Sequence, residues 1–96
     1  MRKKKLFQKT SIEAHSWAIS SMQWDADLNL LFTGSIDGTI GVLRFESGDS
    51  LKHSIYRKPV GRKVNSIVLL DGSTGLLAVG GTANSSGDCN IQIMRV

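Results

Sequence analysis

The sequence predicts an all-β protein that contains two similar antiparallel sheets. Short segments rich in Val, Ile, Leu and Thr alternate apolar with polar residues, and Gly, Asn and Asp separate them, as expected for strands joined by tight turns. No segment of the 96 residues carries a convincing apolar stripe at helical spacing. In addition, the pattern of the first half returns in the second half, about 45 to 51 residues later.

The predicted strands of the first half centre on residues 30–45, which read LLFTGSIDGTIGVLRF. Two arms rich in Leu, Ile, Val and Phe flank an Asp-Gly step, which favours the positive φ that a tight hairpin turn needs. This stretch therefore predicts a hairpin with strands near 29–35 and 39–46. The alternating segment AISSMQW before it predicts a further strand near 18–24.

The three strands of the first half have counterparts in the second half, near 62–70, 75–81 and 89–96. In the alignment, NLLFTGS pairs with GLLAVGG, DGTIGVLRF pairs with DCNIQIMRV, and AISSMQW pairs with VNSIVLL after a shift of one place. The offset grows because the loops of the second unit are longer, and loops tolerate insertion. Two further stretches, residues 6–12 and 50–56, can supply a fourth strand to each unit.

Composition places the chain among ordinary folded domains. Hydrophobic residues make up 41% and charged residues 21%, which are near globular averages. The single Cys, Cys89, excludes an internal disulfide and favours a reducing compartment, so we expect a cytoplasmic or nuclear protein. No apolar run approaches the ~20 residues that cross a bilayer, and the basic start MRKKK is not followed by a signal-peptide core.

Two segments of the first repeat resemble the WD-repeat family. The segment AHSWAISSMQW is similar to the family's Gly-His…Val-x-Ser-Val-x-Trp opening, and LLFTGSIDGTIGVLRF is similar to its Leu-Leu-Ala-Ser-Gly-Ser-x-Asp-Gly-Thr-Ile-x-Val-Trp-Asp strand pair. The resemblance runs through nearly the whole chain. The chain departs from the pattern at Leu43-Arg44 and Met94-Arg95, where the family has Trp-Asp, and the second repeat lacks the His.

The resemblance implies two propeller blades, each of four antiparallel strands. Residues 1–5 would then be a basic N-terminal tail, residues 6–57 an outer strand plus the first blade, and residues 58–96 a second blade that lacks its outer strand. Closed propellers use about four to eight blades, so two blades form an incomplete β-propeller or one completed by oligomerisation. Either the chain is part of a longer propeller, or copies assemble head to tail and each lends residues 6–12 to the next.

The resemblance also implies a structural hydrogen-bond network at His15, Thr33 and Asp37, with Leu43 in place of the Trp that usually ends it. A buried Asp in a tight turn needs donors for its carboxylate, and a His N–H with backbone amides can supply them. A hydrolase that uses His15 and Asp37 is a further reading, but no nucleophile elbow or oxyanion hole accompanies these residues. We therefore expect no catalytic residues and no enzyme.

The sequence predicts neither a metal site nor a cofactor. His15 and His53 lack carboxylates at ligand spacing. The glycines of the predicted turns are not followed by a helix or by Gly-Lys-Ser/Thr, so they do not form a phosphate loop. These glycines are expected at turns and strand ends.

The chain offers two kinds of candidate partner contact. Trp17 precedes a predicted strand in a loop, and exposed aromatic side chains are enriched in protein interfaces. Packing of Trp17 against a neighbouring blade is the alternative. Trp24, in contrast, belongs to the alternating pattern and is predicted to lie in the core. The second kind of contact is a cluster of basic residues, which either binds polyanions or keeps a charged surface solvated. The cluster consists of Arg57, Lys58, Arg62 and Lys63.

These features together predict a non-catalytic, WD-repeat-like scaffold that mediates protein–protein interactions in a macromolecular complex. Its partners would be other proteins, including the remaining blades of a longer propeller or further copies of itself. The alternative is a polyanion-binding module that holds nucleic acid or acidic lipid headgroups, such as RNA or phosphoinositide, through its basic clusters. Salt dependence separates the two, because counterion release makes polyanion binding fall steeply with salt.

Overall fold

The computed structural model describes residues 11–46, 49–81 and 91–96. This part of the chain contains β-strands and no helix, and hence no helix that could cross a membrane. The prediction of an all-β protein is confirmed. The strands are β1 (Ile19–Asp25), β2 (Leu30–Ser35), β3 (Thr39–Glu46), β4 (Asp49–Pro59), β5 (Val64–Asp71), β6 (Leu76–Gly81) and β7 (Gln92–Arg95).

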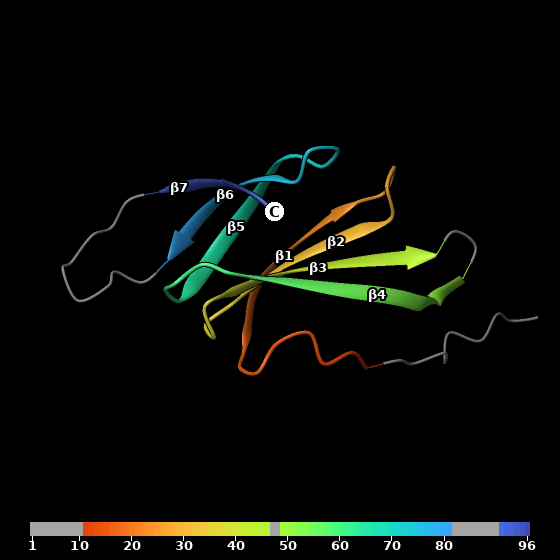
Figure 1. Cartoon of the computed structure of the whole chain (residues 1–96), viewed down its shortest axis with the longest axis horizontal. Coiled ribbons are helices and arrows are strands. Elements are labelled where there is room, and N and C mark those ends of the chain that lie inside the picture. Colours follow the sequence, from red (N-terminus) through yellow and green to blue (C-terminus); the bar gives the residue numbers. More distant parts are fainter. Residues whose placement is uncertain (1–10, 47–48, 82–90) are drawn as a thin grey trace, which may run out of the picture.

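The strands form two separate antiparallel sheets (Figure 1). The first sheet has the order β1-β2-β3-β4 and the second the order β5-β6-β7, so within each sheet the strands pair in the order in which they follow along the chain. The predicted fourth strand at 50–56 is present within β4, and the second sheet is one strand shorter than the first. The predicted strand at 6–12 lies mostly outside the described residues, and its last two residues are not in a strand.

The register of strand pairing repeats between the sheets. Both first hairpins also share an irregularity at the same place, between Ile19 and Ser21 in β1 and between Val64 and Ser66 in β5. The first three strands of the two sheets therefore share a pairing pattern, although β5 has a second irregularity, between Leu69 and Asp71, that β1 lacks. The matching pairs are Met22↔Thr33 with Ile67↔Val79, Trp24↔Leu31 with Leu69↔Leu77, and Leu31↔Leu43 with Leu77↔Met94.

The turns that join the first two strands of each sheet also correspond. Asp25, the last residue of β1, accepts hydrogen bonds from the backbone amides of Asp27 and Leu28. Asp71, the last residue of β5, accepts one from the amide of Ser73 at 3.1 Å. The last turn position is left-handed in both copies, with Asn29 at φ 55 and Gly75 at φ 70. Asn and Gly tolerate this conformation at lower cost than other residues, which explains their presence.

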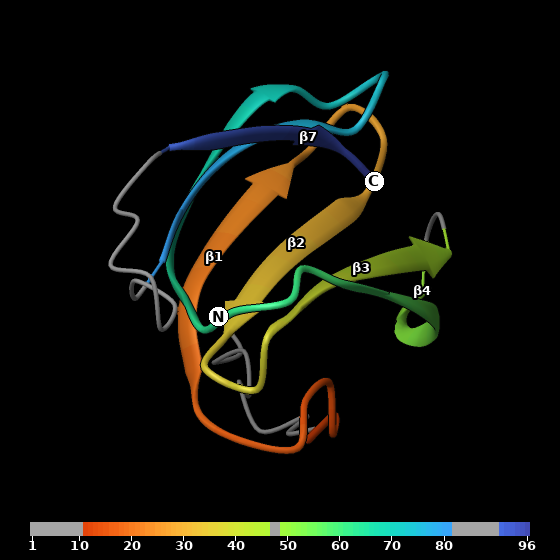
Figure 2. The same ribbon diagram turned by 60° about the vertical axis from the view of Figure 1, so that its left-hand side comes forward.

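The hydrophobic core lies between the two sheets, where β5 packs against β1 and β2. Figure 2 shows the three-stranded sheet beside β1 and β2, on one side of the four-stranded sheet. Each sheet contributes one face, because alternate residues of a strand point to opposite faces. The buried apolar cluster consists of Leu30, Phe32, Ile40, Val64, Ile67, Leu77 and Val79.

A glycine and two serines bring the sheets close together. A Cβ atom at Gly34 would lie only 2.6 Å from Val64 Cγ1, so this strand position has room for no side chain. The Ser20 hydroxyl donates a hydrogen bond to the Val64 carbonyl oxygen. Ser21 Oγ accepts a hydrogen bond from the Ile67 amide at 3.2 Å. Polar side chains of β1 thereby satisfy backbone groups of β5 inside the interface.

The opposite faces of the two sheets carry exposed apolar side chains. Trp24, which the alternation led us to place in the core, is 51% exposed, so that prediction is wrong. Trp24 pairs with Leu31, and both lie on the face turned away from the second sheet. It meets Phe45 edge-on at 5.9 Å between ring centroids. On the second sheet, Val68 and Ile93 are similarly exposed, at 52% and 57%.

Candidate functional site

The side chain of His15 is fully buried at one end of the first sheet. Its Nε2 atom lies 2.6 Å from Thr33 Oγ1. Its Nδ1 atom lies 2.8 Å from Thr39 Oγ1 and 3.4 Å from Asp37 Oδ2. The structure thus brings together the three residues predicted to form a network, and it adds Thr39, which sequence reasoning missed.

Local backbone structure explains how these residues meet. Thr33 belongs to β2, Asp37 to the β2–β3 turn and Thr39 to the start of β3, whereas His15 comes from the segment before β1. The imidazole lies against Gly41 of β3, where a Cβ atom would be 3.2 Å from Nε2 and closer still to Thr33 Oγ1. Glycine at this strand position therefore makes room for the imidazole.

Every oxygen of the Asp37 carboxylate accepts hydrogen bonds. Oδ1 accepts the amide of Thr39 at 2.9 Å and its hydroxyl at 2.6 Å, and Oδ2 accepts the amide of Ser16 at 2.9 Å. Burial raises the pKa of Asp37, but the hydrogen bonds from Thr39 and Ser16, together with His15, outweigh burial and hold that pKa below its usual value. The carboxylate is therefore ionised at neutral pH.

The hydrogen bonds also fix the tautomer of His15. Thr39 has one hydroxyl proton and donates it to Asp37, so Thr39 Oγ1 must accept from His15 Nδ1–H. Burial lowers the pKa of His15; Asp37 opposes this shift only in part, and Arg57 adds to it. In the neutral ring, Nε2 accepts the hydroxyl proton of Thr33. Both ring nitrogens are thereby engaged inside the protein.

This arrangement fastens the segment before β1 to the β2–β3 turn. A serine-hydrolase arrangement would need His15 to contact a hydroxyl that a substrate can reach. The hydroxyl at Nε2 belongs to Thr33, which is 1% exposed, and the nearby Ser35 is fully buried with its hydroxyl donated to the Ala18 carbonyl oxygen at 2.8 Å. Within the described residues no three His, Cys, Asp or Glu side chains come together to hold a metal ion.

The neutral state of His15 leads to a first prediction about pH. The pKa of His15 is lower in the folded state than its usual 6.5, so below that pH the unfolded chain binds more protons than the folded one. The free energy of unfolding should therefore fall between about pH 7.5 and about pH 5.5, as urea titrations at both values would measure. A His15→Gln variant should lose this pH dependence and a His53→Gln variant should keep it. If the free energy of unfolding changed with pH by the same amount in both variants, the prediction would be contradicted.

Arg57 and Lys58, which belong to the predicted basic cluster, bond to backbone carbonyl oxygens of the protein. Arg57 donates hydrogen bonds to the carbonyl oxygens of Ala14 and, at 2.8 Å, of Glu13, so it holds the segment that carries His15. Lys58 Nζ donates to the Arg95 carbonyl oxygen at 3.0 Å. Because Arg57 and Lys58 are adjacent in β4, their side chains leave on opposite faces of the sheet.

Arg62 and Lys63 lie apart from these contacts, beside the β2–β3 turn. They line a hollow of about 330 Å³ together with Asp37 and Pro59. The predicted basic cluster is therefore not one continuous cationic surface. Trp17, the predicted aromatic contact, is 63% exposed just before β1.

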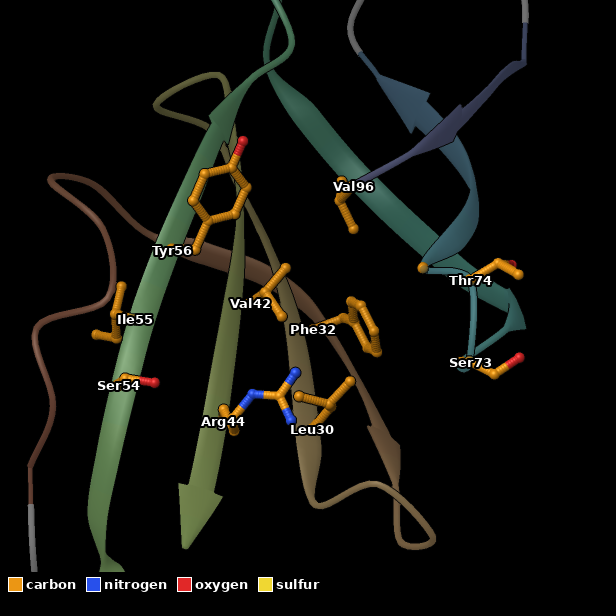
Figure 3. Close-up of a pocket in the computed structure, with 12 residues that line it drawn as sticks. Leu30, Phe32, Val42, Arg44, Ser54, Ile55, Tyr56, Ser73, Thr74 and Val96 are labelled. Atoms are coloured by element: carbon orange, nitrogen blue, oxygen red, sulfur yellow. The ribbon is translucent and has the colours of Figure 1, made fainter.

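A second hollow, which sequence reasoning missed, lies between the two sheets (Figure 3). This groove has a volume of about 320 Å³. Figure 3 shows Phe32 and Val42 pointing from the first sheet towards Val96, which follows β7, and the ring of Tyr56 standing beside them on β4. The residues 72–75 of the β5–β6 turn close one side. Among the residues that the structure describes, the second sheet ends at β7 and contains no counterpart of β4.

Comparison with known proteins found no protein family, no curated protein and no solved structure that matches this chain. The network at His15, the groove and the exposed faces of the sheets are therefore the observations from which a function can be inferred.

Proposed function

We propose that the protein is a non-catalytic, WD-repeat-like scaffold that binds extended segments of other proteins at the groove between its sheets. The observation that carries this proposal is the edge of β7, whose end at Val96 borders a groove lined by both apolar and polar residues, at the place where the repeat calls for one more strand. In this proposal the network at His15, Thr33 and Asp37 is structural. Cytoplasm or nucleus remains the proposed location, since the only Cys favours a reducing compartment.

The edge of β7 is suited to accept a strand. In the described residues β7 pairs with β6 and with no further strand, whereas its counterpart β3 pairs with β4. An extended peptide can add to such an edge through main-chain hydrogen bonds, with side-chain pockets supplying selectivity. Lys58 already donates to the Arg95 carbonyl oxygen, which shows that an acceptor of β7 is within reach of a donor other than β6.

The repeated register indicates which peptide the groove favours. Met94 corresponds to Leu43, and Leu43 pairs with Ile55 of β4. A peptide antiparallel to β7 would therefore place a residue opposite Met94, on the face that looks into the groove, where Val42 and Tyr56 offer apolar contacts. The favoured ligand is an extended segment with apolar residues at alternate positions.

A display library of peptides of about ten residues provides the test. We expect selection on the immobilised protein to enrich peptides with alternating apolar residues. Tyr56→Glu should weaken a selected peptide by about tenfold or more, because it places a charge beside the groove. His53→Glu is the matched control, since His53 is exposed on the same strand but faces the other side. Enrichment of no peptide, or equal binding by both variants, would reject the groove as the site.

The same protein can be tested against the polyanion alternative. Arg57 and Lys58 already bond to backbone carbonyl oxygens, so the predicted cluster has fewer cations to offer than its sequence indicates. We expect weak retention on heparin that disappears at moderate salt. Tight RNA binding that Arg62→Ser and Lys63→Ser reduce would support the polyanion function and overturn the scaffold proposal.

A further inference from the structure

The three-stranded sheet has an outer face, which is the face turned away from the first sheet. This outer face carries exposed apolar side chains. Val68 and Leu70 are each 52% exposed, and Ile93 is 57% exposed. Large apolar patches on a protein surface commonly mark interaction sites. The apolar side chains on this face are Val68, Leu70, Ala78 and Ile93, and the paired residues Ser66 and Gly80 lie beside them.

The interface within the chain shows what such a face packs against. Ser66 and Gly80 are paired in the second sheet as Ser21 and Gly34 are paired in the first. Ser21 bonds to the amide of Ile67 of the opposing sheet, and Gly34 has no room for a Cβ atom because that sheet lies so near. The outer face of the three-stranded sheet therefore repeats the features of a face that receives another sheet.

Within the described residues, nothing at position 80 requires a glycine. Its φ is not in the left-handed region, so the backbone does not require glycine there. In the described part of the structure, nothing lies within 4 Å of a Cβ atom placed at Gly80. Glycine weakens the interior of a strand and often marks the close approach of another backbone. At the equivalent Gly34 that approach is visible.

The complementary face is also present in this chain, on the four-stranded sheet. The side chains of β5 that meet the Gly34 face are Val64 and Ile67, which are 0% and 2% exposed. Their equivalents in β1 are Ile19 and Met22, which are 45% and 58% exposed. The positions that are buried in the second repeat are thus exposed in the first repeat, although their side chains are apolar in both.

We propose that the outer face of the three-stranded sheet binds the outer face of the four-stranded sheet of a second copy of this chain. The contact continues the interface found within the chain, with β1 of the second copy seated as β5 is seated on β1 and β2. This inference shares one assumption with the proposed function, namely that the two sheets are copies of one unit. The groove at Tyr56 is not part of the proposed interface between chains.

Such an interface is heterologous, because two different faces meet. Repetition with a constant rotation closes a ring, and repetition without closure gives a filament. Since each chain supplies two sheets, rings of two to four chains would hold about four to eight sheets, the range that closed rings of sheets adopt. We expect a discrete assembly of this size rather than a monomer.

Gly80→Val tests the inference without disturbing the fold. A Cβ atom at this position meets no other atom of the described residues within 4 Å, whereas the valine side chain would block the approach of a second sheet. Sedimentation and light scattering over a range of concentrations should give the mass of an assembly for the parent and of a single chain for Gly80→Val. Met22→Lys should also give single chains, because it blocks the other face. Tyr56→Lys, on the groove side, is the control that should assemble like the parent.

A mixture of the two blocked variants provides the decisive result. Gly80→Val retains its four-stranded outer face and Met22→Lys retains its three-stranded outer face, so together they should form a complex of two chains and no larger species. If Gly80→Val melts early, Val68→Lys replaces it in the same mixture. A parent that stays monomeric at high concentration, or a mixture that forms no complex, would overturn the inference. Either result would leave peptide capture at the groove intact, which separates this failure from failure of the proposed function.

Discussion

Replacing Phe32 with Ala should lower the free energy of unfolding by about 3–5 kcal/mol. Phe32 is 1% exposed and belongs to the apolar cluster between the sheets. Truncation removes the ring and leaves a cavity whose walls belong to two different sheets, so collapse around it would require the sheets to move. A domain of about 96 residues has a stability of about 5–15 kcal/mol, so the loss is a large share of the total.

Phe45→Ala is the matched control for this measurement. Phe45 lies one strand away, is only partly buried, and contacts Trp24 and His53 on the outer face of the first sheet. Urea unfolding of both variants at low protein concentration, where single chains prevail, should show a much smaller loss for Phe45→Ala. Equal losses would mean that the core does not lie between the sheets.

Asp37→Ala should cost about 1–3 kcal/mol of stability, the second large effect. The carboxylate accepts hydrogen bonds from the amides of Ser16 and Thr39 and from the Thr39 hydroxyl, and it neighbours His15. Its removal leaves the two Thr39 donors without their acceptor at a partly buried turn, and the segment before β1 loses its bond to the β2–β3 turn. Thermal or urea unfolding measures the loss.

Asp71→Ala provides the comparison for Asp37→Ala. Asp71 accepts hydrogen bonds from Ser73 in an exposed turn, so water can replace its bonds when the carboxylate is removed. We expect a clearly smaller effect on unfolding. If Asp37→Ala were as stable as the parent and yet lost a specific activity, the structural role of His15 and Asp37 would be refuted and catalysis would be the better reading.

Most of the strand order could be predicted because local chemistry specifies it. An Asp-Gly step between two alternating apolar arms favours a hairpin in almost any context, and the repeat predicted three matching strands in the second half. The position of Trp24 could not be predicted in this way. Alternation along β1 shows which of its residues share a face of the first sheet. It does not show which of the two faces is covered, because that depends on where β5 packs, through residues distant in sequence such as Gly34 and Val64.

The candidate site shows the same division between local and distant information. The resemblance to a known repeat predicted the meeting of His15, Thr33 and Asp37. The spacing of Asp37 and Thr39, two residues apart across a turn glycine, is a signal that could have added Thr39, because an Asp side chain commonly bonds to the backbone two residues on. Gly41 and the groove gave no such signal, since both depend on what lies opposite them in space.

The nearest-neighbour pairing of the strands also bears on how the chain reaches its native state. Each described sheet joins strands that are adjacent in sequence, so hairpins form after closing short loops, at a small cost in chain entropy. The contacts between Ser21 and Ile67 span 46 residues and need a far longer loop. Docking of the two preformed sheets is therefore the step of high contact order, and the rate of folding should depend on the interface around Gly34 more than on either hairpin.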